Sequence, residues 1–167
     1  MRLADNRPQA LHNEALEALE RAIYFNSEDP ALFYLTGVSA AMVAKSKVGF
    51  SAHDEKEMER YFKLSENSYL RALELDITYT RAMYGLAILY AFELNRAKDA
   101  IVQLERYMQI IPGDTSAMFI LARAYFMTED FNRAVEIYDR IAERTKRKEE
   151  REEAFKNRDY IIGIMYE

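Results

Sequence analysis

The sequence predicts an all-α protein built from stacked antiparallel helix pairs, and three observations predict this class. Half of the 167 residues are hydrophobic, and they recur at three- and four-residue steps, which is the spacing of one face of an α-helix. Five glycines and three prolines are too few for the closely spaced turns of a β-sandwich or barrel. Related sets of large and small residues also recur about every 34 residues, which is typical of a helical repeat array.

The composition excludes several classes of site. The chain has no cysteine, which excludes a disulfide framework, a thiolate zinc site and an iron–sulfur cluster. Two histidines are too few for an imidazole-rich metal site, so we expect no metal and no cofactor. The net charge of −5 argues against nucleic-acid binding, which usually requires a basic stripe. The 13% of aromatic residues supply enough apolar surface for a folded core.

The N-terminal stretch MRLADNRPQA has no apolar signal core. No apolar run in the chain approaches the ~20 residues that span a bilayer. We therefore expect a cytoplasmic protein without membrane insertion, although an exported chain whose leader had been removed would have the same sequence.

Three helices are expected in the first half of the chain. The first covers Gln9–Asn26, and the second follows Pro30, whose missing N–H donor is harmless at a helix start. A break at Lys47–Phe50 separates the second helix from a long third one. Ser51 caps this third helix, which runs to about Asp76.

The second half of the chain also reads as helix after helix with short joints. Pro112 and Gly113 mark one of these joints. The expected helices are Thr80–Leu94, Ala97–Ile111, Thr115–Met127, Asp130 to about Glu153, and Phe155–Tyr166.

Comparison of the chain with itself reveals a repeat. First-helix positions recur at an offset of 35 residues, and second-helix positions recur at 34 or 35. The earliest copy, around Phe33 and Gly37, precedes the next by 50 residues, which is one period plus about sixteen inserted residues. The aligned residues are Met83, Leu86, Ala87 and Tyr90 with Met118, Leu121, Ala122 and Tyr125 in the first helices, and Ser65 and Tyr69 with Ala100 and Leu104 and with Ala134 and Tyr138 in the second helices.

These residues resemble the tetratricopeptide repeat, a helix–turn–helix unit of about 34 residues. The stretch AMFILARAYFMTEDFNRAVEIYDRI is the best copy, and RAMYGLAILY with KDAIVQLERYMQIIP is a good one. The copy formed by ALFYLTGVSAA and ENSYLRALELD has Thr36 and Ala40 where leucine and tyrosine are usual. The resemblance implies a right-handed α-α superhelix that forms a single domain over residues 1–167.

The resemblance further divides the chain into three full repeats with a half-repeat at each end. The insertion is expected to extend the hairpin of repeat 1, either as a docking arm or as a hairpin sealed on itself. The second helix of repeat 3 is expected to be lengthened through KRKEEREE. The expected segments are 8–26 (half-repeat or cap), 30–77 (repeat 1, with the insertion at about 44–60), 80–112 (repeat 2), 115–153 (repeat 3) and 155–167 (a cap or the start of a fourth repeat).

In this family the first helices line a concave groove that usually holds a peptide or helix of a partner protein. The corresponding positions form an apolar surface, rich in aromatic and methionine side chains, with two arginines that can clamp a carboxylate. The resemblance therefore implies a non-catalytic adaptor or scaffold. The candidate groove residues are Tyr34, Val38 and Met42 from repeat 1, Arg81, Tyr84, Ile88 and Phe92 from repeat 2, and Phe119, Arg123, Phe126 and Met127 from repeat 3.

Two alternatives remain open at this point. The C-terminal helix or a second copy of the chain could fill the groove, which would make the protein a self-associating structural component. The chain could also be an accessory part of a larger assembly. The lysine, arginine and asparagine clamp that some family members use for chaperone tails is absent, because its positions hold Tyr34, Leu35, Val38, Gly85 and Ile120.

No motif in the sequence indicates catalysis. The cluster His53-Asp54-Glu55 has no second histidine nearby and reads as a solvated helix start. The run RIAERTKRKEEREE alternates its charges at four-residue steps, which is typical of a solvent-exposed helix rather than of a nucleic-acid surface. We expect no enzyme activity.

Overall fold

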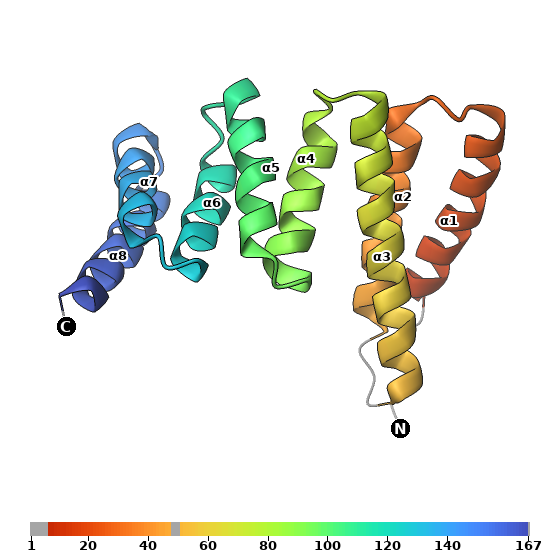
Figure 1. Cartoon of the computed structure of the whole chain (residues 1–167), viewed down its shortest axis with the longest axis horizontal. Helices are drawn as coiled ribbons and strands as arrows, with labels where there is room; N and C mark the ends of the chain where they lie inside the picture. The colour runs from red at the N-terminus through yellow and green to blue at the C-terminus, as the bar shows by residue number, and fades with distance from the viewer. Residues whose placement is uncertain (1–6, 48–50, 167) are drawn as a thin grey trace. The chain divides into compact units, whose positions relative to one another are not determined.

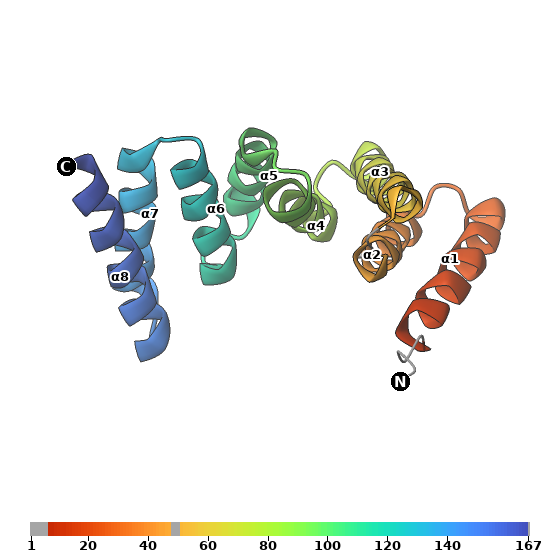
Figure 2. The ribbon, with the colours of Figure 1, turned by 90° about the horizontal axis from the view of Figure 1, so that it is seen from below.

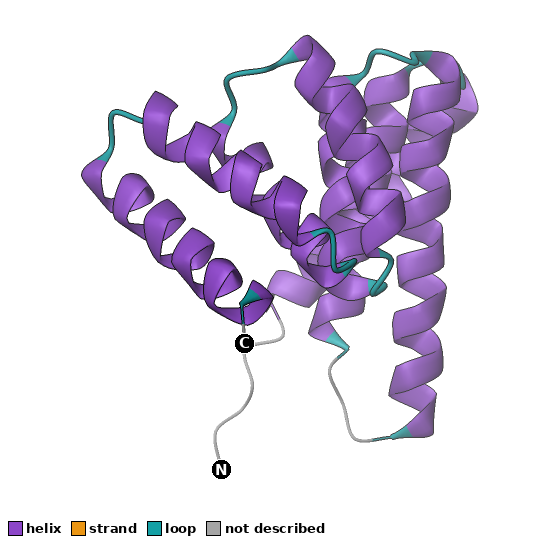
Figure 3. Cartoon of the chain, turned by 60° about the vertical axis from the view of Figure 1, so that its left-hand side comes forward, coloured by secondary structure: helices purple, strands orange, loops and turns teal. Residues whose placement is uncertain are grey.

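Short turns join a succession of α-helices, and this confirms the predicted all-α class (Figure 1, Figure 3). The structure, a computed structural model, describes residues 7–47 and 51–166, and it contains no strand within these ranges. The helices are α1 (Arg7–Phe25), α2 (Pro30–Ser46), α3 (Ala52–Leu75), α4 (Thr80–Ile88), the π-helical turn η1 (Leu89–Glu93), α5 (Ala97–Ile110), α6 (Thr115–Met127), α7 (Phe131–Arg144) and α8 (Lys148–Met165).

These helices form two compact units, Met1–Leu89 and Tyr90–Glu167. The sequence resemblance predicted a single domain, and the boundary between the units falls inside the predicted repeat 2 at 80–112. Each unit has a buried apolar core of its own.

Capping side chains set the helix starts in the first unit. Asp29 accepts a hydrogen bond from the backbone N–H of Ala31 at 2.8 Å, and Pro30 takes the first helical position of α2. Ser51 caps α3 as predicted, because its hydroxyl accepts a hydrogen bond from the Asp54 N–H at 3.2 Å. These contacts satisfy N–H groups that have no partner within the helix itself.

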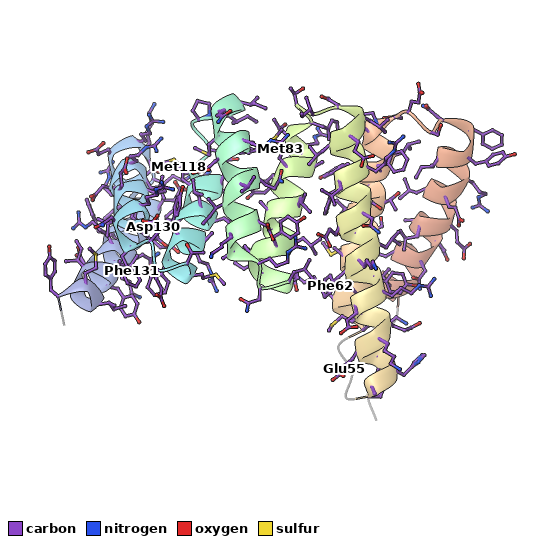
Figure 4. All side chains as sticks on the ribbon, in the orientation of Figure 1. Glu55, Phe62, Met83, Met118, Asp130 and Phe131 are labelled. Carbon is purple, nitrogen blue, oxygen red and sulfur yellow. The ribbon has the colours of Figure 1, made fainter. Side chains whose placement is uncertain are left out.

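The helices α2 and α3 lie side by side as a long hairpin, and Figure 4 shows Phe62 part-way along α3. Val43 and Phe62 are buried in this hairpin. Farther along, Lys47 Nζ pairs with Glu57 Oε2 at 2.6 Å, and this hydrogen bond raises the pKa of Lys47. The predicted joint at 48–50 lies outside the described residues. The described part of the hairpin is thus held by contacts between its own two helices.

Tyr69 occupies the core of the first unit. Its side chain is 4% exposed, and a Cβ atom added at Gly37 or Gly85 would come within 2.7 or 2.8 Å of its ring. The Ser65 hydroxyl donates a hydrogen bond to the Gly37 carbonyl oxygen at 2.7 Å. Burial raises the pKa of Tyr69 to about 12. Two positions without a side chain, one on α2 and one on α4, therefore let both helices approach this tyrosine.

The second unit buries large side chains between α5, α6 and α7. Leu104, Met118 and Ile141 have no exposed surface. Asp114 caps α6 and Asp130 caps α7, each by accepting a backbone N–H bond. Figure 4 shows Met118 on α6 and Asp130 at the turn before α7.

A π-helical turn replaces the end of the helix predicted over Thr80–Leu94. The helix α4 gives way to η1 at Leu89. First-helix positions of repeats 2 and 3 lie 35 residues apart, one more than the ~34 of the family, and a π turn accommodates one extra residue within a helix. The following Asn95 has φ 52°, and Glu129 at the equivalent turn of repeat 3 has φ 62°. Both turns use a left-handed residue just before the next helix.

The predicted long helix from Asp130 to about Glu153 is wrong, because the chain breaks at residues 145–147. The helix α7 ends at Arg144, and α8 begins at Lys148, earlier than the predicted Phe155. Thr145 adopts an extended conformation, with ψ 137°, and is 5% exposed. Its hydroxyl accepts a hydrogen bond from the Arg147 N–H and donates one to Glu150. This local network offers the backbone an alternative to continued helix.

The Thr145→Val variant should lose about 1 kcal/mol of unfolding free energy at neutral pH, because the Arg147 N–H loses its acceptor. The Thr145 hydroxyl is the main cause of the lowered pKa of Glu150. A carboxyl whose pKa is lowered on folding contributes stability above its unfolded pKa, ordinarily 4.5, and loses that contribution as the pH falls through the folded value. Urea unfolding measured from acidic to neutral pH should therefore show the largest difference in unfolding free energy between wild type and variant at neutral pH. If the difference in unfolding free energy does not become smaller below pH 4.5, the hydrogen bond from Thr145 to Glu150 does not contribute to stability.

Candidate functional site

Five of the eleven predicted groove residues line one cavity in the second unit, with a volume of about 570 Å³. Four of these five come from α6, and Phe92 comes from η1. The rest of the lining comes mostly from α7 and α8, which follow α6 in the views of Figure 1 and Figure 2. The lining residues are Phe92, Phe119, Ile120, Arg123, Phe126, Met127, Tyr138, Glu153, Asn157, Tyr160 and Ile161.

Aromatic rings form most of the cavity wall. Phe119 packs edge-on against Tyr138, with ring centroids 6.0 Å apart. Phe126 lies 6.2 Å from the ring of Tyr160 and so joins α6 to α8. Tyr160 is 65% exposed and Phe92 is 45% exposed. The cavity therefore has a packed aromatic base and two rings that remain available to a ligand.

Arg123 gives this apolar cavity a positive charge. Its guanidinium lies 5.1 Å from the centre of the Phe92 ring, in a cation–π arrangement. Its side chain is exposed, and it forms no ion pair with any residue that the structure describes. A guanidinium held in this way can still take a carboxylate in a bidentate hydrogen bond.

The wall formed by α8 was not predicted from the sequence, because the groove positions were assigned only to the first helices of the three full repeats. Asn157 and Ile161 of α8 line the cavity together with Tyr138 of α7, and burial raises the pKa of Tyr138. Arg158 pairs with Asp139 of α7 at 2.9 Å and so fixes α8 against α7. The C-terminal helix does not fill the predicted groove in this unit but forms one side of it. The burial of Ala154 shows that the packed face of α8 begins before residue 155.

In the first unit, Tyr34 belongs partly to the core rather than to a free surface. Its ring lies 6.1 Å from that of Tyr69 and 5.9 Å from that of Tyr79. The side chain is half-buried. Tyr34 therefore contributes packing within the unit as well as surface.

The other predicted groove residues of the first unit lie on α2 and α4. Met42 is 46% exposed, and Arg81 is exposed as well. Val38, Tyr84 and Ile88 are half-buried. These residues remain a predicted binding surface of the first unit.

The described residues contain no cluster of metal-ligating side chains. Within the same ranges, no helix combines the length and the apolar character needed to cross a bilayer.

Comparisons with known proteins give a consistent family signal. A family profile described as tetratricopeptide repeat matches residues 91–151. Anaphase-promoting complex subunit 3 of Schizosaccharomyces pombe is 25% identical over 132 residues, which is 79% of this chain and 17% of that protein. The chain thus spans less than a fifth of the length of this relative.

A solved structure, the crystal structure of MamA protein, resembles this fold with a TM-score of 0.61. The two are 21% identical in sequence, and the match covers 77% of this chain and 61% of that one. At this identity the likeness concerns the fold alone.

Proposed function

Because the chain is a tetratricopeptide-repeat protein, we propose that it is a non-catalytic adaptor whose second-unit cavity binds an apolar segment of a partner protein. The partner segment inserts apolar or aromatic side chains between α6 and α8. An acidic residue of the partner pairs with Arg123. In the first unit, Arg81 on α4 has the same role toward a second acidic group.

The observation that carries this proposal is the composition of the cavity wall in the second unit. Five aromatic rings surround about 570 Å³, a volume within the ~300–1,000 Å³ range of ligand sites. Aromatic and methionine side chains are the ones that most often anchor protein partners. Arg123 and Glu153 are the charged groups of the lining, so an apolar segment with a single acidic residue fits it better than a highly charged one.

A peptide display library panned against the whole protein tests this proposal. We expect the enriched peptides to combine aromatic or aliphatic residues with one aspartate or glutamate. The Tyr160→Ala variant should weaken their binding about tenfold, because it removes an exposed ring of the wall. Tyr160 is a better probe than Phe119, whose ring also packs against Tyr138.

The Arg123→Gln variant tests the charge separately. It should weaken the binding of an acidic peptide about tenfold. Binding of the same peptide with asparagine or glutamine in place of the acidic residue should not change, as expected for a direct pair in a double-mutant cycle. Val102→Ala is the matched control, since Val102 is 51% exposed but lies outside the cavity lining. Equal losses in the control and in the Tyr160→Ala variant would contradict the proposal.

Self-association through the same cavity is the competing outcome. Sedimentation velocity over a wide range of protein concentrations separates the two. A monomer that binds the selected peptides supports the adaptor role, whereas a dimer that Tyr160→Ala dissociates would overturn it.

A further inference from the structure

The first unit contains a cavity of its own, with a volume of about 660 Å³. It lies on the side of α2 away from the predicted groove residues of that helix. Its walls are α1 and α3, and α2 forms the floor through Phe33 and Thr36. These floor residues lie almost opposite Tyr34 and Val38 around the helix, since successive residues are about 100° apart. We call this cavity the α1–α3 groove. Its lining is Asn13, Leu16, Glu17, Glu20, Ile23, Phe33, Thr36, Arg60, Tyr61, Leu64 and Ser68.

The second unit has an equivalent cavity of about 500 Å³ between α5 and α7. The repeat register relates the two cavities position by position, with an offset of 85 residues for their first two helices and 69 for the third. The matched pairs are Glu20 with Glu105, Ile23 with Met108, Thr36 with Leu121, Leu64 with Arg133, and Ser68 with Ile137.

In the second unit a polar bridge joins the three helices that line this cavity. The Tyr125 hydroxyl donates a hydrogen bond to Glu105 at 2.5 Å. Arg133 lies over the Tyr125 ring, 5.4 Å from its centre, and its guanidinium is 4.0 Å from the Glu105 carboxylate. The Tyr125 ring therefore occupies part of the space between the helices, and Arg133 is the charged partner of Glu105.

The first unit keeps the glutamate but lacks both of its partners. Glu20 takes the place of Glu105, whereas Ala40 and Leu64 stand where Tyr125 and Arg133 would be. Thr36 and Ser68 are smaller than the matched Leu121 and Ile137, which agrees with the larger volume of the α1–α3 groove.

The charge of the α1–α3 groove is set mainly by α1. Glu17 and Glu20 lie one turn apart on the same helix face, and both are exposed. The basic residue of the described lining, Arg60, lies over the ring of Tyr61 on α3. It pairs with neither glutamate in the described structure. The α1 wall therefore presents two carboxylates beside the apolar Leu16 of the same helix and close to Phe33 of the α2 floor.

We propose that the α1–α3 groove is a second docking site, which takes a partner segment with an arginine next to a large apolar side chain. The arginine pairs with Glu17 and Glu20, and the apolar side chain fills the space above Thr36. The partner thus supplies from outside what Tyr125 and Arg133 supply within the second unit. Because this site lies in the first unit, it is independent of the cavity between α6 and α8.

Two synthetic helical peptides provide the probes. Both carry leucine and tyrosine on one face, and one has arginine where the other has glutamate. Fluorescence anisotropy with the full chain at low salt should show the arginine peptide binding about tenfold more tightly than the glutamate peptide. Equal affinity for the two peptides, or no binding of either, would overturn the proposal.

Two variants locate the binding. The double variant Glu17→Gln with Glu20→Gln should weaken binding of the arginine peptide about tenfold. The control double variant is Glu143→Gln with Glu149→Gln, which changes the net charge equally but in the second unit. It should leave the binding unchanged. Thr36→Leu with Ser68→Ile fills the groove with the residues of repeat 3. This variant should also block the arginine peptide while it keeps the helical circular dichroism and thermal unfolding of the wild type.

A filled variant that still folds and binds the arginine peptide as well as the wild type does would overturn the proposal. If the filled variant does not fold, the glutamine pair against its charge-matched control decides the question. The Tyr160→Ala variant should leave this peptide unaffected. A loss with Tyr160→Ala would place the peptide in the second-unit cavity and would contradict a separate site.

Discussion

The Gly37→Ala variant is expected to lose about 2 kcal/mol of unfolding free energy. Its new Cβ would lie 2.7 Å from the ring of Tyr69, well inside van der Waals contact. The ring is 4% exposed and also lies against Gly85, so little free space is available for it to move. Overpacking of this kind typically costs about 1–3 kcal/mol or more, and it outweighs the gain of ~1 kcal/mol in helix propensity.

Urea denaturation measures this loss of unfolding free energy, and two further variants test whether contact with Tyr69 causes it. Gly163→Ala on α8 is the control, because nothing lies within 4 Å of its new Cβ, and it should be neutral or slightly stabilising. In a Tyr69→Leu background, Gly37→Ala should cost much less, since leucine lacks the ring atoms that meet the Cβ. Equal costs in the two backgrounds would show that the tyrosine is not the cause.

The Leu104→Ala variant should lose about 3 kcal/mol. Leu104 has no exposed surface, and it takes the place in repeat 2 that Tyr69 and Tyr138 take in the neighbouring repeats. Truncating a buried leucine removes its transfer free energy and leaves a cavity, which together cost about 2–5 kcal/mol.

Val102→Ala on the same helix provides the control for this second variant. Val102 is 51% exposed, so its truncation should change the unfolding free energy by less than about 0.5 kcal/mol. The two variants should therefore differ clearly in their urea midpoints. Similar midpoints would mean that the repeat register assigns the buried face of α5 wrongly.

Much of the fold was predictable because local signals and the repeat agree. The helix Thr115–Met127 has the predicted bounds, and Ser51 caps α3 as the sequence indicates. Apolar spacing, caps and short turns act within a few residues of one another, so they can be recognised in one sequence. The all-α class and the repeat family follow from the same signals.

The break at Thr145 could not be predicted in this way. The stretch KRKEEREE has strong helix formers and neither glycine nor proline, so its local propensity favours a continuous helix. The break is stabilised instead by side-chain hydrogen bonds that form once the turn is made: Thr145 bonds Arg147 and Glu150, and Arg151 donates hydrogen bonds to the carbonyl oxygens of Ala142 and Thr145. The π turn at Leu89 was missed for a related reason, since one extra residue can equally well lengthen a loop.

The candidate site was predictable in part. The repeat register identified the α6 side of the second-unit cavity, from Phe119 to Met127, because these residues share one helix face. It missed Asn157 and Tyr160, although both lie within the predicted last helix Phe155–Tyr166, because the groove positions were assigned only to the first helices of the three full repeats. It also did not anticipate that Tyr34 would pack against Tyr69 and Tyr79, since ring contacts between helices depend on their packing.

Photo-crosslinking tests whether the cavity between α6 and α8 holds the partner segment. A photo-reactive phenylalanine analogue replaces Tyr160 in one protein and the exposed Val102 in another, and each is irradiated with a peptide selected from the display library. We predict a crosslink from position 160, and its loss when excess unlabelled peptide competes. A crosslink from position 102 with none from position 160 would show that the partner segment does not bind in this cavity.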